Sequence, residues 1–330
     1  MIVSKTPLRI SFAGGGTDLP SFYKENGYGA VFSTCIDSYI YVSIKEHTPL
    51  FDERFRLNYS ESELVNRVDE IKNDIIRESL KFMEIDDRLY ISTIADAPAM
   101  TGLGSSSAFC VGLLNALYEY KGRVVSPGRL AEEAAHIEID VLKHPMGKQD
   151  HYAAAFGGLN YFSFHADGSV TVKPVIAAET VIGELSDSML SFWTRITRPA
   201  RSVLSEKDQN TRKNTETLLA MRQQASDLVS LLCGGDFSLE KFGRVIHEGW
   251  EMKRGLASRV SNGEIDGYYE SAMKNGAYGG KISGAGGGGF LSVFSPPGAR
   301  ARIIETMRAQ GILHHKFHFG SRGTMVMRFS

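Results

Sequence analysis

The sequence feature that most constrains the fold is a glycine- and serine-rich run, Pro98–Ala108, between a predicted strand and a predicted buried helix. The strand is predicted over Leu89–Ala95, which is rich in β-branched and aromatic residues. The helix is predicted over Ser105–Tyr120, where apolar residues cover almost every face, as is typical of a helix inside a domain. Glycines let a backbone approach a phosphate, and the free N–H groups of a helix's first turn stabilise negative charge. A tight turn with a serine N-cap would explain one glycine and one serine, but not Gly102, Gly104 and three consecutive serines, so the run predicts a phosphate-binding loop.

Glycine motifs of other enzyme classes do not fit this chain. The loop lacks the Gly-Lys-Ser/Thr ending of a Walker A motif, and Ala108 stands where a nucleophile elbow needs glycine, which disfavours a serine hydrolase. A second run, Gly284–Gly289, has the letters of a dinucleotide fingerprint, yet it leads into the strand-like Phe290–Phe294 instead of a helix. It therefore predicts a turn between strands, where missing side chains allow close contact with the backbone.

The remaining patterns predict a mixed α+β chain of two domains, residues 1–185 and residues 186–330. A chain of 330 residues exceeds the size at which one core usually keeps growing, and the order of elements does not follow a regular βαβ series. The predicted strands are Leu8–Ala13, Ala30–Thr34, Tyr39–Lys45, Leu89–Ala95, Gly158–Phe164, Val170–Val175, Met189–Thr194, Tyr278–Ser283 and Phe290–Phe294. The predicted helices are Ser62–Met83, Ser105–Tyr120, Pro127–Leu142, Val203–Leu232, Phe237–Arg254 and Ala299–Ala309.

The charge balance limits the classes of partner. Lys and Arg number 37 against 38 Asp and Glu, for a formal net charge of -1, so no global basic field indicates nucleic acid or a membrane surface. The sequence has no signal-peptide pattern and no apolar run long enough to span a bilayer, which predicts a cytoplasmic protein. It gives no indication of a homo-oligomer. An anionic ligand must therefore be bound by local groups.

Three motifs occur in the order and spacing seen in the GHMP kinases, the family of galactokinase, homoserine kinase and mevalonate kinase. Pro7–Asp18 resembles the first motif of that family, Pro98–Ala108 its phosphate loop and Lys281–Phe290 its third motif. The resemblance implies an N-terminal ribosomal-protein-S5-domain-2-like α/β domain and a C-terminal ferredoxin-like α+β domain. Sugar kinases of the family usually carry an acidic residue and a histidine where this chain has Gly15 and Gly16. That departure points to the heptose-phosphate kinase branch, whose members read Ala-Gly-Gly-Gly-Thr-Asp.

Two carboxylates, Glu138 and Asp150, are candidates for the chemistry. The chain breaks at Pro145-Met146-Gly147 between them, so both could reach one pocket. Phosphoryl transfer to a hydroxyl needs a group that orients or accepts its proton and a carboxylate for the magnesium ion that bridges the nucleotide phosphates. By resemblance, Glu138 and Ser106 would ligate Mg²⁺, Asp150 would act on the substrate hydroxyl, and Arg9 would face the transferred phosphoryl group. Whether Asp150 removes the proton or only orients the hydroxyl stays open.

The resemblance also implies which residues bind the two substrates, with ATP as phosphoryl donor and Mg²⁺ as its metal. Asp18 is expected to accept hydrogen bonds from sugar hydroxyls, as carboxylates commonly do. The residues implied to bind nucleotide are Pro98, Gly102, Leu103, Gly104, Ser105, Ser106 and Ser107. Those implied to bind the acceptor are Gly15, Gly16, Thr17, Asp18, Gly286 and Gly287.

A basic segment suggests that the acceptor already carries a phosphate. Arg195, Arg198 and Arg201 follow a predicted strand, and Lys148 lies two residues before Asp150. Arginine forks suit phosphate oxygens, although a solvated basic loop explains the segment equally well. With the triple glycine of the first motif, the resemblance implies D-glycero-D-manno-heptose 7-phosphate as acceptor, phosphorylated at its anomeric hydroxyl in nucleotide-heptose synthesis for bacterial surface polysaccharides. The alternatives are an unphosphorylated sugar such as fucose or galactose, and a non-catalytic member of the family.

Overall fold

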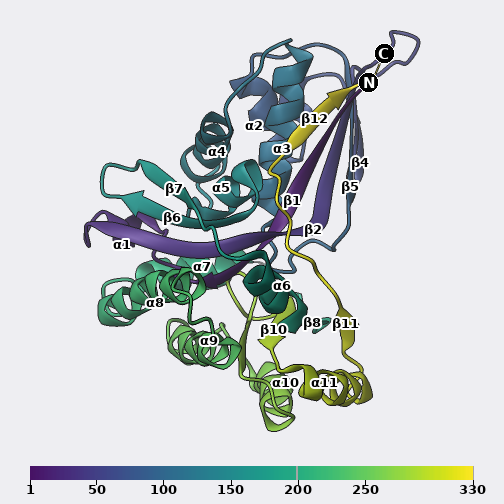
Figure 1. Ribbon diagram of the computed structural model, residues 1–330. Helices are drawn as coiled ribbons and strands as arrows, with labels where there is room; N and C mark the ends of the chain where they lie inside the picture. The colour runs from purple at the N-terminus through teal and green to yellow at the C-terminus, as the bar shows by residue number, and fades with distance from the viewer. Residues whose placement is uncertain (198–199, 330) are drawn as a thin grey trace.

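The computed structural model describes residues 1–197 and 200–329, and their strands form two separate sheets (Figure 1). The strands of the larger sheet are β1 (Ile2–Ala13), β2 (Tyr28–Glu46), β3 (Phe55–Asn58), β4 (Ser62–Val65), β5 (Leu89–Ala95), β6 (Leu159–His165), β7 (Val170–Pro174) and β12 (Met325–Arg328). Their order is β12-β1-β2-β5-β3-β4, and β6 and β7 extend the sheet from the first half of β2. The smaller sheet is antiparallel, in the order β11 (Leu313–His315), β8 (Met189–Trp193), β10 (Phe290–Phe294) and β9 (Gly279–Ile282).

Helices cover both sheets. Those packed in the larger, N-terminal part are α1 (Pro20–Tyr23), η1 (Val68–Glu70), α2 (Asp74–Phe82), α3 (Ser105–Tyr120), α4 (Pro127–Ala135), the π-helical η2 (His136–Val141) and α5 (Gln149–Phe156). Those of the later part are α6 (Glu179–Ser188), α7 (Ala200–Gln209), α8 (Thr215–Cys233), α9 (Leu239–Arg254), α10 (Gly263–Lys274) and α11 (Pro297–Ala309). As its all-round apolar pattern predicts, α3 is buried against β1 and β2. No helix formed by the described residues is both long and apolar enough to cross a membrane.

The larger hydrophobic core spans both parts, and the later part has a second core of its own. The ring of Phe12 at the end of β1 lies 5.6 Å from that of Phe242 on α9 and 6.1 Å from that of Phe294 on β10. Helix α8 also packs on β1 and β2, and the last strand, β12, pairs with β1, which brings the two chain ends together (Figure 1). The end of β1 is therefore held firmly between both parts of the molecule.

The prediction of a mixed α+β architecture is confirmed, but one predicted helix is wrong in its first half. Ser62–Met83 divides into β4, the short turn η1 and α2. The Glu63 carboxylate accepts hydrogen bonds from the N–H groups of Lys72 and Asn73, at 2.6 and 3.1 Å, and the Asn73 side chain caps α2. Pairing with β3 thus outweighs the helical spacing of the apolar residues before Asn73.

Smaller differences concern the later part. The predicted helix Val203–Leu232 is interrupted between α7 and α8, where the Asn214 side chain donates to the carbonyl of Leu256 at 3.0 Å. Helices α6 and α10 are not predicted from the sequence at all. The predicted domain boundary at residues 185 and 186 falls inside α6 and stays a prediction.

Candidate active site

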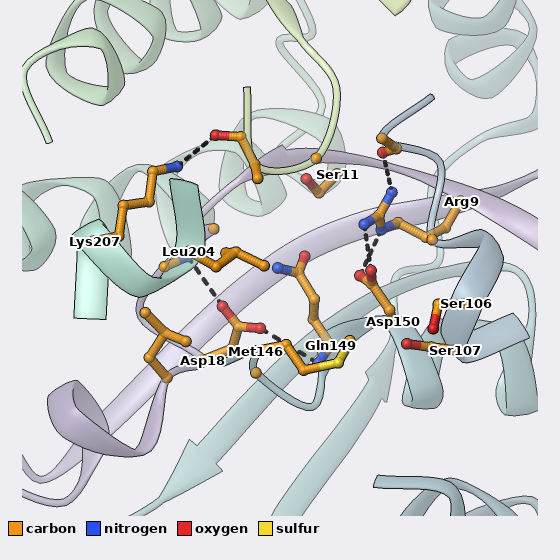
Figure 2. Close-up of a pocket in the computed structure, with 18 of the residues that line it drawn as sticks. Arg9, Ser11, Asp18, Ser106, Ser107, Met146, Gln149, Asp150, Leu204 and Lys207 are labelled. Carbon is orange, nitrogen blue, oxygen red and sulfur yellow. Dashed lines mark hydrogen bonds and ion pairs between the residues drawn. The ribbon is translucent and has the colours of Figure 1, made fainter. Parts of the chain in front are cut away.

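A cavity of about 340 Å³ lies where the two parts of the molecule meet, and it gathers most of the predicted site residues (Figure 2). The N-terminal part contributes the end of β1 with the loop after it, the phosphate loop before α3, and the start of α5. The later part contributes α7, α9, β9 and the glycine-rich loop after β9. The cavity is therefore assembled from segments that are far apart in the sequence.

Arg9 and Asp150 form a bidentate ion pair at the centre of this cavity. Arg9 Nε donates to Asp150 Oδ1 at 2.7 Å and Nη2 donates to Oδ2 at 2.5 Å, while Nη1 donates to the carbonyl of Gly102 at 2.6 Å. Arg9 is only 5% exposed, and Asp150 lies in the first turn of α5. Two parallel charge-assisted hydrogen bonds fix both the position and the plane of the carboxylate.

The phosphate loop lies directly beside this pair. Gly102 and Gly104 have φ values of 77° and 81°, which side chains rarely adopt, and a Cβ on Gly102 would lie 2.5 Å from the carbonyl oxygen of Ser283. The loop can therefore meet the third glycine-rich motif backbone to backbone. Ser105 and Ser107 are among the residues that line the cavity, and their hydroxyl groups are buried with no hydrogen-bond partner among the described residues. They are available as donors to a ligand.

Two predicted nucleotide-binding residues, the exposed Pro98 and the buried Leu103, do not line the cavity. Leu103 is fully buried, and its carbonyl accepts a hydrogen bond from Arg9 N–H at 3.0 Å. Pro98 accepts one from the Thr101 hydroxyl at 3.1 Å. Both are outside the cavity lining, and the contacts they make support the shape of the loop.

Glu138 is fully buried in η2, where three side chains contact its carboxylate. The Ser106 hydroxyl donates to Oε1, His151 Nε2 lies 2.8 Å from Oε2, and His144 Nδ1 lies 3.5 Å from Oε1. Burial by itself raises the pKa of Glu138, but hydrogen bonds from His144, His151 and Ser106, with the charge of His151, outweigh it and lower the pKa. Glu138 is therefore ionised at neutral pH although its side chain is fully buried.

Glu138 and Ser106 fit a magnesium site. Both present oxygen ligands, and their hydrogen bond brings these oxygens together beside the first turn of α3. Mg²⁺ commonly takes one or two protein ligands and completes its octahedron with waters and substrate phosphates. The pair thus has the chemistry and the place that such an ion requires.

Asp18 lies on the opposite side of Asp150 from the serines of the phosphate loop (Figure 2). Its carboxylate accepts from the N–H groups of Gly16 at 3.0 Å and Gln149 at 3.4 Å, and burial followed by the charge of Asp150 raises its pKa. A Cβ on Gly147 would lie 2.1 Å from Asp18 Oδ2, so the chain can turn there only with glycine. The Asp18 carboxylate is thus fixed in place by backbone groups.

The other residues of the first motif divide into two groups. Gly15 and Gly16 line the cavity. Thr17 does not: it is fully buried, its hydroxyl lies 2.8 Å from the carbonyl of Gly14, and it accepts from Ala30 N–H at 2.9 Å. Its contacts stabilise the turn that presents Asp18.

The residues predicted to bind a substrate phosphate are not brought into the cavity. Lys148 Nζ is held by the Glu132 carboxylate at 2.8 Å and faces a neighbouring hollow, and Arg195 is exposed outside the lining. Arg198 and the side chain of Arg201 lie outside the described part of the chain. Gly286 and Gly287 also lie off the lining, and Gly287 N–H donates to Val260 at 2.7 Å. Lys148 and Arg195 therefore do not line this cavity, and their contact with a substrate phosphate stays a prediction.

Sequence reasoning missed three cavity lysines, Lys207, Lys253 and Lys281, which we call the lysine triad. All three are less than 10% exposed. Their hydrogen bonds go to main-chain carbonyls: Lys207 to Ala285 at 2.8 Å, Lys253 to Ile282 at 2.9 Å and Gly284 at 2.6 Å, and Lys281 to Phe12 at 3.1 Å. Two sequence features could have identified them. Lys281 is the first residue of the third motif, and Lys253 lies three positions after Trp250, which places it on the buried face of α9.

Burial changes the protonation of the triad. It lowers the pKa of Lys281 to about 7, helped by the nearby charges of Arg9 and Lys207. It lowers the pKa of Lys207 to about 8, with Asp18 opposing the change, and that of Lys253 well below its usual range. The cavity is therefore a site where an added negative charge is stabilised.

Known proteins match the chain over its whole length. Family models described as GHMP kinases N terminal domain and GHMP kinases C terminal match residues 68–158 and 228–313. The chain is 31% identical to a D-glycero-alpha-D-manno-heptose 7-phosphate kinase of Campylobacter jejuni, with 99% of each chain covered. It is 25% identical to a galactokinase of Pyrococcus furiosus, with 87% of each chain covered. A crystal structure of a D-glycero-D-manno-heptose 1-phosphate kinase from Bacteroides thetaiotaomicron superposes with a TM-score of 0.82 at 26% identity, covering 100% of both chains.

Proposed function

This chain belongs to the GHMP kinase family and is an ATP-dependent sugar kinase, and from that premise we propose that its acceptor is D-glycero-D-manno-heptose 7-phosphate. The product would be the 1,7-bisphosphate, formed at the anomeric hydroxyl. Such a product suits the synthesis of nucleotide-activated heptose for bacterial surface polysaccharides. The full-length similarity to a kinase with this printed substrate supports the choice.

The observation that carries the proposal is the order of groups across one cavity. Unpartnered serine hydroxyls at the start of α3 lie on one side of the Arg9–Asp150 pair, and Asp18 lies on the other (Figure 2). A phosphoryl donor at the serines and a sugar at Asp18 would meet at Asp150. This is the arrangement that direct transfer between two bound substrates needs.

In the proposed reaction the acceptor hydroxyl oxygen bonds to the γ-phosphorus of ATP, and the bond from that phosphorus to the ADP oxygen breaks. Asp150 orients the hydroxyl and takes its proton, while Arg9 holds the carboxylate and faces the charge on the transferred group. Ser105, Ser107 and the N–H groups of the first turn of α3 bind the donor phosphates. Glu138 and Ser106 would hold Mg²⁺, which when bound neutralises charge on those phosphates.

An acceptor panel assayed for ADP release tests the proposal. The panel contains heptose 7-phosphate, the free heptose, fucose and galactose, each at the same ATP and Mg²⁺ concentration. We expect the highest kcat/KM with heptose 7-phosphate and a bisphosphate product by mass spectrometry. A higher kcat/KM with fucose or galactose would refute the substrate, and absence of ADP release with every sugar would favour a non-catalytic family member.

A further inference from the structure

The lysine triad presents hydrogen-bond donors for which the protein provides too few acceptors. An ammonium group has three N–H donors, whereas the carbonyls named above take one from Lys207, one from Lys281 and two from Lys253. Among the described residues, none of the three forms an ion pair. In its protonated form, each member of the triad therefore keeps at least one donor for a group that enters the cavity.

The carboxylates of the cavity do not balance this charge. Asp150 is engaged by Arg9, and Glu138 is engaged by a serine and two histidines. The charge of Asp18 raises the pKa of Lys207, but the Asp18 carboxylate accepts its hydrogen bonds from backbone N–H groups. Burying ammonium groups without counterions is unfavourable, so binding of an anion beside the triad is favourable.

The order of residues along the cavity indicates which anion the triad would bind. Figure 2 shows Lys207 on the Asp18 side of Asp150 and the phosphate-loop serines on the other side. The nucleotide phosphates belong with the serines, so an acceptor that places its hydroxyl at Asp150 extends toward Asp18 and Lys207. A negative group at the far end of the acceptor would meet Lys207, whose charge also acts on Lys253 and Lys281.

We propose that the lysine triad binds a phosphate group that the acceptor already carries, and that it thereby selects phosphorylated over free sugars. This inference rests on the proposed function, since it assumes a phosphorylated acceptor. It assigns that role to residues buried in the cavity in place of Lys148 and Arg195, which the structure keeps outside it. A phosphate dianion offers several acceptor oxygens to the free donors of three ammonium groups, and such charge-assisted hydrogen bonds are strong.

The test compares Lys207→Met with Lys281→Met and a matched control. Methionine keeps an unbranched chain while removing the charge, and replacing buried charge by apolar side chains is commonly tolerated. Lys121→Met is the control, because Lys121 Nζ also donates to a carbonyl, that of Met83 at 2.6 Å, but lies outside the cavity. Steady-state rates are measured for ATP, for heptose 7-phosphate and for free heptose.

We expect KM for heptose 7-phosphate to rise roughly 10- to 100-fold in both triad variants, the loss of one charge-assisted hydrogen bond. The ratio of kcat/KM for heptose 7-phosphate to kcat/KM for free heptose is expected to fall by a similar factor, and the control is expected to keep the wild-type ratio. An equal loss with both sugars would overturn the inference. A rise confined to KM for ATP would also overturn it, since the triad would then serve the nucleotide.

A second measurement needs no variant. At about pH 8, calorimetric titration of the wild-type protein with heptose 7-phosphate, in buffers of different ionisation enthalpy, is expected to reveal proton uptake, because the bound dianion recharges the triad. Binding of free heptose should cause no proton uptake, and equal proton uptake with both sugars would contradict the inference. If wild type does not prefer the phosphorylated sugar, the proposed function itself fails; if it does and the triad variants keep that preference, only the triad assignment fails.

Discussion

Replacing Asp150 by asparagine removes one negative charge from the centre of the cavity and keeps the size of the side chain. Asparagine offers one oxygen where Asp150 offers two to Arg9, and its NH₂ group then faces a guanidinium N–H. Arg9 retains the carbonyl of Gly102 at 2.6 Å but loses its counterion. The variant therefore separates the role of the carboxylate in the reaction from its role in holding Arg9.

The structure gives a magnitude for each role. A positioned acid or base typically contributes about 10²- to 10⁴-fold to a rate, so we expect kcat to fall by roughly that factor. Breaking a buried ion pair costs about 3 to 5 kcal/mol, and the partial exposure of Asp150 together with the surviving hydrogen bonds of Arg9 reduces this to about 2 to 3 kcal/mol of unfolding free energy. The dissociation constant of ATP should change by less than about threefold, about 0.6 kcal/mol, because the serines are untouched.

Three assays check these values: ADP release for kcat, calorimetry for ATP binding, and urea unfolding for stability. Asp227→Asn is the control, since Asp227 is exposed on α8 and accepts a side-chain hydrogen bond from Gln223. A double variant, Arg9→Met with Asp150→Leu, should recover stability while staying inactive. A kcat for Asp150→Asn within about tenfold of wild type would refute the assigned role.

Three further predictions concern the metal site, the glycine contact and pH. In Glu138→Gln, the Mg²⁺ concentration for half-maximal ADP release should rise at least about tenfold, because a neutral amide replaces the proposed ligand, and an unchanged value would contradict that role. Gly102→Ala should lower the free energy of unfolding in urea by about 1 to 3 kcal/mol because of its positive φ, and the close carbonyl of Ser283 should lower it further. The control Gly122→Ala has a φ of 66° and open space around it, so it should lower the free energy of unfolding less. Equal losses in the two variants would argue against the close contact. Since folding lowers the pKa of Lys281 from 10.5 to about 7, the folded state binds fewer protons between these values, and this contribution to stability should increase as pH rises through that range. The urea midpoint of unfolding is measured as a function of pH. Lys281→Met should make its increase with pH smaller than in wild type, and Lys207→Met should reduce the increase less. The same pH dependence in wild type and Lys281→Met would contradict this prediction.

Much of the fold followed from local pattern. The buried helix α3, the strands around it and the order of the motifs were predicted from spacing, and the family and its kinase activity are confirmed. Elements whose pattern fits two structures were predicted less well, as in the segment that Glu63 organises into a strand and a turn. There the pairing of β4 with β3 decides, and no local pattern reveals it.

For the site, the sequence by itself determined the parts whose geometry is local. Two glycines with positive φ and a run of serines at a helix start specify the conformation of the predicted phosphate loop through their own backbone and nearest neighbours. Tertiary structure alone decided which distant groups meet. Arg9 and Asp150 are 141 residues apart and Lys281 lies 269 residues from the carbonyl it contacts, so their proximity depends on how two sheets and their helices pack. Burial, which raises or lowers pKa values and leaves the lysine triad short of acceptors, arises from the same packing. For that reason the sequence singled out Arg9 but none of the three lysines that face the cavity.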